Sequence, residues 1–292
     1  MRKLSGIFLV GLCLGAIGAV VVTASHTTSA ASEPIAVTEP VTTITAAPGS
    51  PTGEPAPEAT PTPAPKAGPA PVKVDAGTLD GLVHGGEVSA VVFDRQRGAA
   101  TVSVHADRQY TSASLVKLLI ALSVLQQNGP VADVQRMLSR SDDELASRFW
   151  ADYGGPSIVT RWAAKLHLTG TRPPSDPGRW GDTSITAADV VRIYQYLVAH
   201  GPSAIMSALR GATERGSDGF RQYFGIPDAT DGRAWAVKQG WSCCRPTRTL
   251  HTSGVVGEDS RYIVVVLTEH PARVDYATAS KRVTDIVSTL LG

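Results

Sequence analysis

The sequence predicts an α+β domain in which one antiparallel sheet is packed beside a helical subdomain. Two β-branched, alternating segments open the folded part of the chain, three more strand-like segments come near its end, and helical segments lie between and after them. This order favours one sheet built from both ends of the chain, with the helices gathered beside it. Hydrophobic residues make up 42% of the 292 residues, which is enough apolar material for a sizeable core.

Composition divides the chain into three regions. Residues 1–31 begin with Arg2 and Lys3, continue as an apolar run and end in small residues, which is typical of a signal peptide; the run is also just long enough to remain as an N-terminal membrane anchor. Residues 32–71 are rich in Pro, Thr and Ala, which predicts a disordered, extended linker, either a spacer through a cell wall or a plain connection. Residues 72–292 are expected to form one folded domain. We therefore expect an extracytoplasmic protein, secreted or anchored to the outer face of the plasma membrane.

Hydrophobic periodicity and turn residues predict the elements of the domain in chain order. A hairpin should open the sheet, because two alternating strands flank a turn at residues 95–98. The helix that begins near Ser141 should stop at Gly154-Gly155. The expected strands cover 88–94, 100–105, 234–239, 247–256 and 262–269, and the expected helices cover 79–83, 114–127, 141–153, 157–166, 186–200 and 277–291.

Charge and motif content disfavour several functional classes. The formal net charge is +1, so nothing indicates a nucleic-acid partner. We expect neither a metal nor a cofactor, because metal-ligand spacings, HExxH, the P-loop and dinucleotide-binding glycines do not occur. We also expect the protein to be a monomer. A Ser-His-Asp hydrolase is disfavoured because the GxSxG elbow is missing; His105, His251 and His270, on or beside predicted strands, are expected to be structural.

The three cysteines leave two interpretations open. Cys13 lies in the N-terminal apolar run, where Leu12 occupies the position at which a lipoprotein signal needs a small residue, so no lipobox fits. Cys243 and Cys244 are adjacent and cannot easily supply two ligands to one zinc ion. In an exported protein they could form a vicinal disulfide at the rim of the site; two reduced thiols are the alternative.

The strongest chemical signal is Ser114-Leu115-Val116-Lys117. Positions i and i+3 of a helix share a face, so the lysine lies one turn from the hydroxyl. A serine hydroxyl needs a base to take its proton, and a lysine can serve if burial lowers its pKa. The residues between 115 and 122 are apolar apart from Lys117, which indicates burial rather than a solvent-facing lysine. We therefore interpret Ser114 as a nucleophile and Lys117 as its activating partner.

Two further motifs follow along the chain. In Ser141-Asp142-Asp143, Ser141 either forms a capping box with Glu144, or passes a proton to the leaving group while Asp143 holds Lys117 or the substrate. Lys238-Gln239-Gly240 ends a predicted strand. Gly240 would let a substrate backbone approach closely there; an ordinary strand end is the alternative.

These three motifs, in this order, resemble the SxxK, SDN and KTG set of class A β-lactamases and penicillin-binding proteins, over roughly residues 75–290. The resemblance implies that Ser114 forms an acyl-enzyme and that Lys117 and Ser141 relay protons. It also implies that backbone N–H groups of Ser114 and of a residue near Trp241 or Ser242 form the oxyanion hole. The expected partners are a small-molecule or peptide substrate, a β-lactam or a peptidoglycan stem peptide, and the cell wall.

The same resemblance assigns the binding of a substrate carboxylate. Lys238, with Gln239 and Gly240, would face the carboxylate of a β-lactam or of a D-Ala-D-Ala-like end. Arg248, on the next predicted strand, could add a second carboxylate contact, or lie as an ordinary surface arginine.

The sequence also departs from that family. Asp143 stands where the family has Asn, and Gln239 stands where it has Thr or Ser. Class A β-lactamases use an Ω-loop glutamate to activate the deacylating water, whereas the matching loop here offers Asp176 and Asp182 and no glutamate. The predicted function is therefore an exported serine hydrolase that deacylates slowly. The alternative is a non-catalytic cell-wall binding protein on the same fold.

Overall fold

The computed structural model describes residues 74–244 and 246–292. The predicted signal or anchor segment and the predicted linker lie outside the described residues. Within those residues, no helix is both long enough and apolar enough to cross a membrane.

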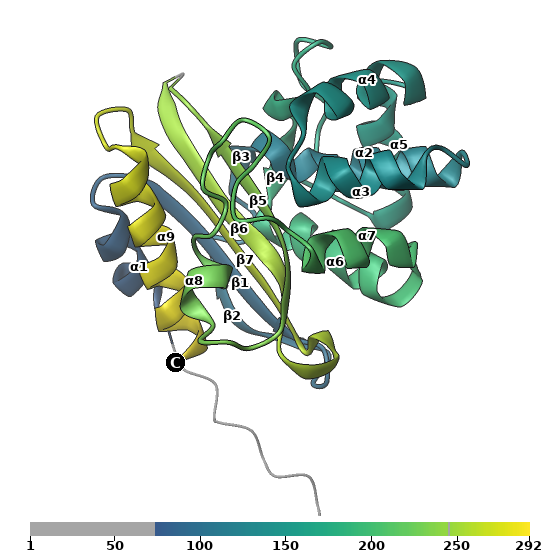
Figure 1. Ribbon diagram of the computed structural model, residues 1–292. Coiled ribbons are helices and arrows are strands. Elements are labelled where there is room, and N and C mark those ends of the chain that lie inside the picture. The colour runs from purple at the N-terminus through teal and green to yellow at the C-terminus, as the bar shows by residue number, and fades with distance from the viewer. Residues whose placement is uncertain (1–73, 245) are drawn as a thin grey trace, which may run out of the picture. The chain divides into compact units, whose positions relative to one another are not determined.

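Five strands among the described residues form one antiparallel sheet (Figure 1). They are β1 (Glu87–Asp94), β2 (Ala99–Val104), β5 (Trp235–Ser242), β6 (Thr247–Val256) and β7 (Tyr262–Pro271). Their order is β2-β1-β7-β6-β5, and β1 pairs along its whole length with β7, so the two ends of the domain meet in the middle of the sheet. A second, two-stranded sheet joins β3 (Gln109–Thr111) to β4 (Ser184–Thr186).

Helices cover both faces of the larger sheet (Figure 1). One face carries the first and last helices with one short helix: α1 (Ala76–Val83), α9 (Tyr276–Leu291) and α8 (Ile226–Ala229). The other face carries the helical region, which comprises α2 (Lys117–Gln126), α3 (Val131–Ser139), α4 (Asp143–Tyr153), α5 (Pro156–Leu166), α6 (Ala187–His200) and α7 (Ser203–Arg210). The 3-10 turns among the described elements are η1 (Ala113–Val116), η2 (Trp180–Asp182) and η3 (Glu258–Ser260).

The central strand β7 is buried on both faces. Val265 and Leu267 join the core on the side of the helical region, whereas Val264 and Val266 join the core under α1, α8 and α9. Successive side chains of a strand point to opposite faces. A continuous β-branched run is therefore what a strand covered on both sides requires, and each buried side chain contributes about 1.5–3 kcal/mol.

The predicted α+β fold and its order of elements are confirmed, and the differences have local causes. The helix expected from Ser114 begins as the 3-10 turn η1, so that α2 starts only at Lys117. The sequence prediction lacks α3, α7, α8, β3 and β4, of which α8, β3 and β4 have only three or four residues each. An element of a few residues spans too few periods of its pattern to be recognised from the sequence alone.

His251 is buried in β6 and joins the two sheets. Its Nδ1 accepts a hydrogen bond from the backbone N–H of Thr268 (3.1 Å), so the ring proton lies on Nε2, which donates to the Thr111 carbonyl of β3 (2.9 Å). Burial lowers the pKa of His251 to about 4, because a charged ring would lose its water, and the hydrogen bond to Thr111 opposes this shift only in part. These are the contacts of a structural histidine.

The buried, neutral His251 predicts that acid destabilises the fold. An unfolded histidine titrates at about pH 6.5. The folded pKa of about 4 means that, between these values, the unfolded chain binds a proton that the folded chain does not. This contribution to stability is complete above about pH 6.5 and is lost as the pH falls toward about 4, by up to about 1.4 kcal/mol per pH unit.

Urea unfolding of the wild type and of His251→Gln between about pH 7 and about pH 5 measures this slope. The variant keeps a side-chain donor and loses the titration, so its free energy of unfolding should depend less on pH, with His270 still contributing a slope of the same sign. Equal slopes in the two proteins would contradict the expectation, and so would an NMR titration midpoint for His251 near about 6.5 in the wild type.

Candidate active site

Ser114 lies on η1, the 3-10 turn that leads into α2, and is 5% exposed. A 3-10 turn repeats every three residues, so Ser114 and Lys117 face the same side, as their spacing predicts. Ala113, directly before Ser114, has a φ of 45°, in the left-handed region that non-glycine residues rarely adopt. Such a conformation persists only where the surrounding structure holds it, which indicates that the position of Ser114 is tightly determined.

The ammonium of Lys117 is the centre of the candidate site. It is fully buried, donates to Ser114 Oγ (2.8 Å), Ser141 O (2.9 Å) and Ser141 Oγ (3.2 Å), and forms an ion pair with Asp143. The Trp180 ring lies over it, with its centroid 4.8 Å from Nζ. Burial lowers the pKa of Lys117, and the carboxylate of Asp143 opposes that shift. A buried lysine of lowered pKa that contacts a serine hydroxyl is able to take the proton of that hydroxyl.

Ser141 lies between two buried lysines. Its Oγ is 3.2 Å from Lys117 Nζ and 2.9 Å from Lys238 Nζ, and its φ of 51° is again left-handed. The interpretation of Ser141 as the helix cap, paired with Glu144, is wrong. Asp142 is the N-cap of α4, and its Oδ1 accepts a hydrogen bond from the backbone N–H of Leu145 (3.0 Å). Because Asp142 caps the helix, the Ser141 hydroxyl is left for the two lysines.

Lys238 lies on β5 and is 1% exposed. Besides Ser141 Oγ, its Nζ donates to the carbonyl of Gln239 (3.0 Å). Burial and the nearby ammonium of Lys117 lower the pKa of Lys238 well below its ordinary value. Gly240 brings β5 close to the nucleophile turn, because a Cβ there would come within 3.0 Å of the Ser112 carbonyl oxygen.

Gln239 points away from the nucleophile. Its Nε2 donates to the backbone carbonyls of Phe224 (2.6 Å) and Gln222 (2.9 Å) and so ties β5 to the segment before α8. The side chain is buried, at 1% exposure, so these contacts hold it in place. The structure therefore does not bring Gln239 together with the other predicted site residues.

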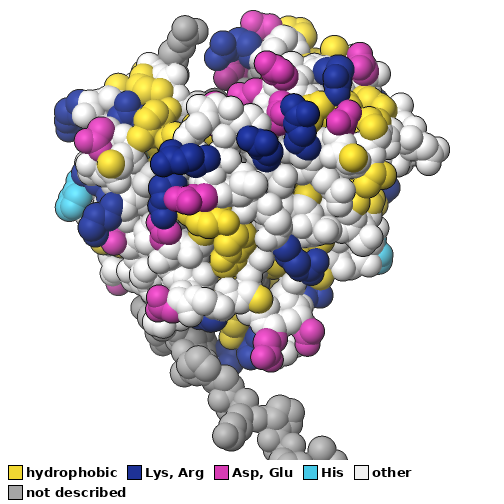
Figure 2. Space-filling model, viewed as in Figure 1, with side chains coloured by type: hydrophobic (Ala, Val, Ile, Leu, Met, Phe, Trp, Pro, Cys, Tyr) yellow, Lys and Arg dark blue, Asp and Glu magenta, His cyan; other side chains and the backbone are white. Residues whose placement is uncertain are grey.

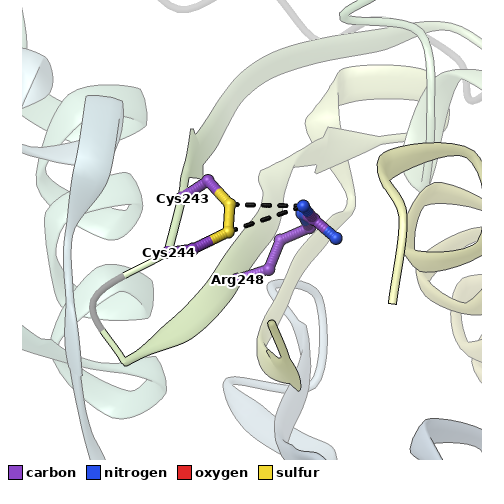
Figure 3. Close-up of a disulfide and its surroundings, with 3 residues drawn as sticks. All are labelled: Cys243, Cys244 and Arg248. Atoms are coloured by element: carbon purple, nitrogen blue, oxygen red, sulfur yellow. Dashed lines mark hydrogen bonds between the residues drawn. A yellow bond between two sulfur atoms is a disulfide. The ribbon is translucent and has the colours of Figure 1, made fainter. Parts of the chain in front are cut away.

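Arg248 is also directed elsewhere. Its Nη2 lies 3.2 Å from Cys243 Sγ and 3.5 Å from Cys244 Sγ (Figure 3). Its guanidinium lies over the Tyr276 ring, 4.5 Å from the ring centroid. Cys243 and Cys244 are joined as a vicinal disulfide directly after β5. Among the described residues that line the cleft beside Ser114, Arg248 does not occur.

A cleft of about 310 Å³ opens beside Ser114. Its lining also includes Asp143, the segment 178–182, and Trp241 and Ser242 at the end of β5. Ser114, Trp241 and Ser242 thus line one cavity. The sequence analysis expects the second oxyanion-hole donor near Trp241 or Ser242. A carbonyl entering this cleft would meet the hydroxyl of Ser114 and backbone groups of η1 and of the end of β5.

The two loop aspartates have different surroundings. Asp182 lines the cleft but is paired with Arg179, whose Nη2 lies 3.2 Å from Asp182 Oδ1. Asp176 instead accepts from the backbone N–H of Gly178 (2.9 Å) and shapes the turn.

Sequence reasoning misses Trp180, whose ring covers Lys117 and whose Nε1 donates to Ser147 Oγ (3.1 Å). A lone tryptophan directly before Gly181 in an otherwise patternless loop is a signal that could have found it.

Comparison with solved structures identifies the class of fold. The β-lactamases from Chitinophaga pinensis and Sphaerobacter thermophilus both align with a TM-score of 0.59, at 12% and 18% identity, over 73% and 75% of this chain and 96% and 97% of their own. The TLA-1 extended-spectrum β-lactamase aligns with a TM-score of 0.61 at 12% identity, over 73% of this chain and 95% of its own. This chain has the fold of the class A β-lactamases, and identities this low show the fold alone.

Sequence comparison identifies the family. Proteins named "Putative lipoprotein LppW" in Mycobacterium tuberculosis and Mycobacterium bovis are 37% identical to this chain over 237 residues, which cover 75% of this chain and 74% of theirs. No protein-family model matches the sequence. The chain belongs to the LppW family.

The Lys117–Asp143 pair predicts how the nucleophile responds to pH. Lys117 must be uncharged to take the proton of Ser114, and the Asp143 carboxylate stabilises its charged form. Asp143→Asn removes that stabilisation and lowers the pKa of Lys117 further. The rising limb of the acylation rate should therefore move to lower pH.

The measurement is the rate at which a neutral fluorophosphonate labels the protein as a function of pH. Glu144→Gln is the matched control, because it removes a neighbouring exposed charge that has no contact with Lys117 among the described residues. A limb that stays in place in Asp143→Asn, or moves to higher pH, would show that Asp143 does not hold the proton of Lys117.

Proposed function

We propose that this chain is an exported serine hydrolase that forms an acyl-enzyme at Ser114 and releases it slowly. The acyl donor is an amide-like substrate of the kind that β-lactams and peptidoglycan stem peptides represent. The observation that carries the proposal is the 2.8 Å contact between Ser114 Oγ and the Nζ of a lysine with no exposed surface. The fold supports it, because the solved structures of the same fold are β-lactamases.

Acylation uses the groups around Lys117. Neutral Lys117 takes the proton of Ser114 as Oγ attacks the carbonyl carbon, and the tetrahedral oxyanion is held by backbone N–H groups of η1 and of the end of β5. The hydroxyl of Ser141, whose Oγ lies 3.2 Å from Lys117 Nζ and 2.9 Å from Lys238 Nζ, donates its proton to the leaving nitrogen. Ser141 then receives a proton from the adjacent lysine ammonium groups. The carbon–nitrogen bond breaks, and the acyl group stays on Ser114.

Deacylation lacks a dedicated base. Asp182 is the loop carboxylate that lines the cleft, and its two oxygens are engaged by the guanidinium of Arg179. General-base assistance is typically worth about 10²–10⁴-fold in rate. Its loss adds about 3–5 kcal/mol to the barrier for hydrolysis of the ester, at about 1.36 kcal/mol for each factor of ten. The acyl-enzyme should therefore be hydrolysed more slowly than it forms.

The proposal predicts a persistent adduct on Ser114. The full-length protein is mixed with a fluorescent penicillin and, separately, with a neutral fluorophosphonate, and intact mass and peptide mapping follow the adduct over time. Ser114→Ala and Lys117→Ala should abolish labelling, while Ser157→Ala, which removes an exposed serine on α5, should label like the wild type.

Two results would contradict this account. Rapid multiple turnover of a chromogenic cephalosporin would show that a deacylation base operates. No adduct from either probe would favour the non-catalytic cell-wall protein instead, a reading that the orientations of Gln239 and Arg248 support.

Export is the second part of the proposal. It is supported by the N-terminal pattern of residues 1–31 and by relatives that are named lipoproteins. An oxidising compartment outside the cytoplasm would also maintain the Cys243–Cys244 disulfide.

Protein recovered from the exported fraction should therefore resist alkylation at both cysteines until it is reduced, and the same chain made in the cytoplasm should be alkylated at both. Intact mass before and after reduction separates the two states. Two freely alkylated thiols in untreated exported protein would contradict both the disulfide and the compartment.

A further inference from the structure

Trp180 lies between the Ser114 cleft and the ammonium group of Lys117. The tryptophan lines the cleft, and its ring also lies over Lys117 Nζ, with the centroid 4.8 Å away. Among the described residues that line the cleft, Lys117 does not occur, and its side chain has no exposed surface. A small molecule in the cleft therefore meets the indole before it meets the ammonium.

The other sides of the ammonium are occupied by oxygen atoms. Nζ donates to Ser114 Oγ (2.8 Å) and to the carbonyl (2.9 Å) and hydroxyl (3.2 Å) of Ser141, and it is paired with Asp143. A lysine ammonium has three N–H donors, so these oxygens satisfy all of them. The indole covers the side that faces the cleft.

The indole is held in this position by the elements around it. Its Nε1 donates to Ser147 Oγ of α4 (3.1 Å). The backbone on either side is also fixed: the Pro177 carbonyl accepts from Trp150 Nε1 (2.8 Å), and the Gly181 carbonyl accepts from Ser112 Oγ (3.2 Å). The ring is thus tied both to α4 and to the turn that carries the nucleophile.

This position matters for hydrolysis of an acyl group on Ser114. The attacking water must lie within about 2.6–3.2 Å of a base, and Lys117 is in direct contact with Ser114. A water about 2.8 Å from Nζ on the side of the ring would lie about 2 Å from the ring centroid. Favourable contacts with ring carbons need about 3.5 Å or more, so the indole fills that position.

We propose that Trp180 keeps hydrolytic water away from the acyl-enzyme, because its indole occupies the place from which Lys117 could activate that water. The proposal rests on the proposed function for the acyl-enzyme itself. It adds a second cause of slow deacylation to the missing carboxylate, since a base beside the ester is present but covered.

Acylation and hydrolysis make different demands on Lys117. Acylation uses the direct contact between Nζ and Ser114 Oγ, which the ring does not interrupt. Hydrolysis needs a third molecule beside Nζ. With the ring removed, neutral Lys117 would take a proton from water as the water oxygen attacks the carbonyl carbon. The bond from that carbon to Ser114 Oγ then breaks, and Oγ takes the proton from Lys117.

The direct test is the decay of the adduct in variants of Trp180. The full-length wild type, Trp180→Ala and Trp180→Phe are acylated with a fluorescent penicillin, the excess is removed, and intact mass follows the adduct. Decay should be about tenfold or more faster in Trp180→Ala, and within about threefold of the wild type in Trp180→Phe, which keeps a ring. A Trp180→Ala adduct that decays at the wild-type rate, or more slowly, overturns the proposal.

The pH dependence of decay identifies the base. Unassisted attack by hydroxide rises about tenfold per pH unit, whereas attack by water through Lys117 levels off once the lysine is uncharged. Decay in Trp180→Ala should therefore reach a plateau with rising pH, and decay in the wild type should continue to follow hydroxide. Faster decay in Trp180→Ala that still follows hydroxide would contradict a covered Lys117. A merely structural role of the tryptophan would not produce the plateau.

Two controls separate the ring from general loosening of the fold. Trp235→Ala removes a partly buried indole at the other end of β5, where it packs on Tyr223, and should leave decay within about twofold of the wild type. Ser147→Ala removes the hydrogen bond of the Trp180 indole and keeps its ring, so it should accelerate decay less than Trp180→Ala. Equal acceleration by Trp235→Ala would contradict the proposal. Trp180→Leu, which also lacks a flat ring, replaces Trp180→Ala if the latter does not fold.

The substitutions at Trp180 leave the charge of the protein unchanged. On the face shown in Figure 2, Lys and Arg side chains alternate with Asp and Glu side chains, and the formal net charge is +1. Penicillin and hydroxide are both anions, so a change in surface charge would alter their local concentrations. Because these variants exchange one neutral side chain for another, a change in decay arises within the cleft.

A measurement on unacylated protein separates this proposal from the proposed function. Reductive methylation with formaldehyde and cyanoborohydride, followed by peptide mapping, compares Lys117 with the exposed Lys165. Lys117 should react about fivefold or more faster in Trp180→Ala than in the wild type. An adduct at Ser114 that decays equally in both proteins overturns the cover and leaves the nucleophile standing. Faster methylation without an adduct in any variant upholds the indole as the cover of Lys117 and contradicts the hydrolase.

Discussion

The burial of one ammonium group, that of Lys117, is the constraint on which the rest of the site depends. A charged group removed from water is destabilised by several kcal/mol unless it is paired and hydrogen-bonded. Lys117 receives oxygen partners from Ser114, from both the carbonyl and the hydroxyl of Ser141, and from Asp143. The left-handed backbone of Ser141 allows one residue to supply two of these oxygens. The same burial lowers the pKa of Lys117 and makes it a possible base.

The sheet fixes the second lysine against the first. The Lys238 carbonyl accepts from Ser253 Oγ of the neighbouring strand β6 (2.8 Å), and the hydroxyl of Tyr194, on α6, donates to the Ser253 carbonyl (3.0 Å). Tyr194 and Ser253 are both fully buried, and this chain of direct contacts connects the helical region to β5. The distance between the two lysines is thus set by packing of the core. That is why a site built on a 3-10 turn and a strand end can be held precisely.

The part of the fold and site that the sequence predicts is the part with local causes. The alternating strands, the hairpin and the closing helix follow from periodicity and turn residues, and the pairing of Ser114 with Lys117 follows from their spacing among apolar neighbours. Asp142 rather than Ser141 caps α4, and no local pattern distinguishes these two adjacent polar residues. The orientations of Gln239 and Arg248 depend on partners that come from the segment before α8 and from the disulfide, so sequence spacing gives no access to them.

The carboxylate of Asp143, at a position where the resembled family has an amide, raises the pKa of Lys117 and so opposes the effect of burial. The central claim is that Lys117 is a buried lysine whose pKa is lowered despite that carboxylate. The most direct test is an NMR pH titration of protein labelled with 13C at the lysine Cε positions, with the Lys117 signal assigned from a Lys117→Met variant. This account predicts a titration midpoint below the 10.5 of an ordinary lysine. A midpoint at or above 10.5 would mean that the Asp143 ion pair outweighs burial, and that Lys117 cannot serve as the base for Ser114 at neutral pH.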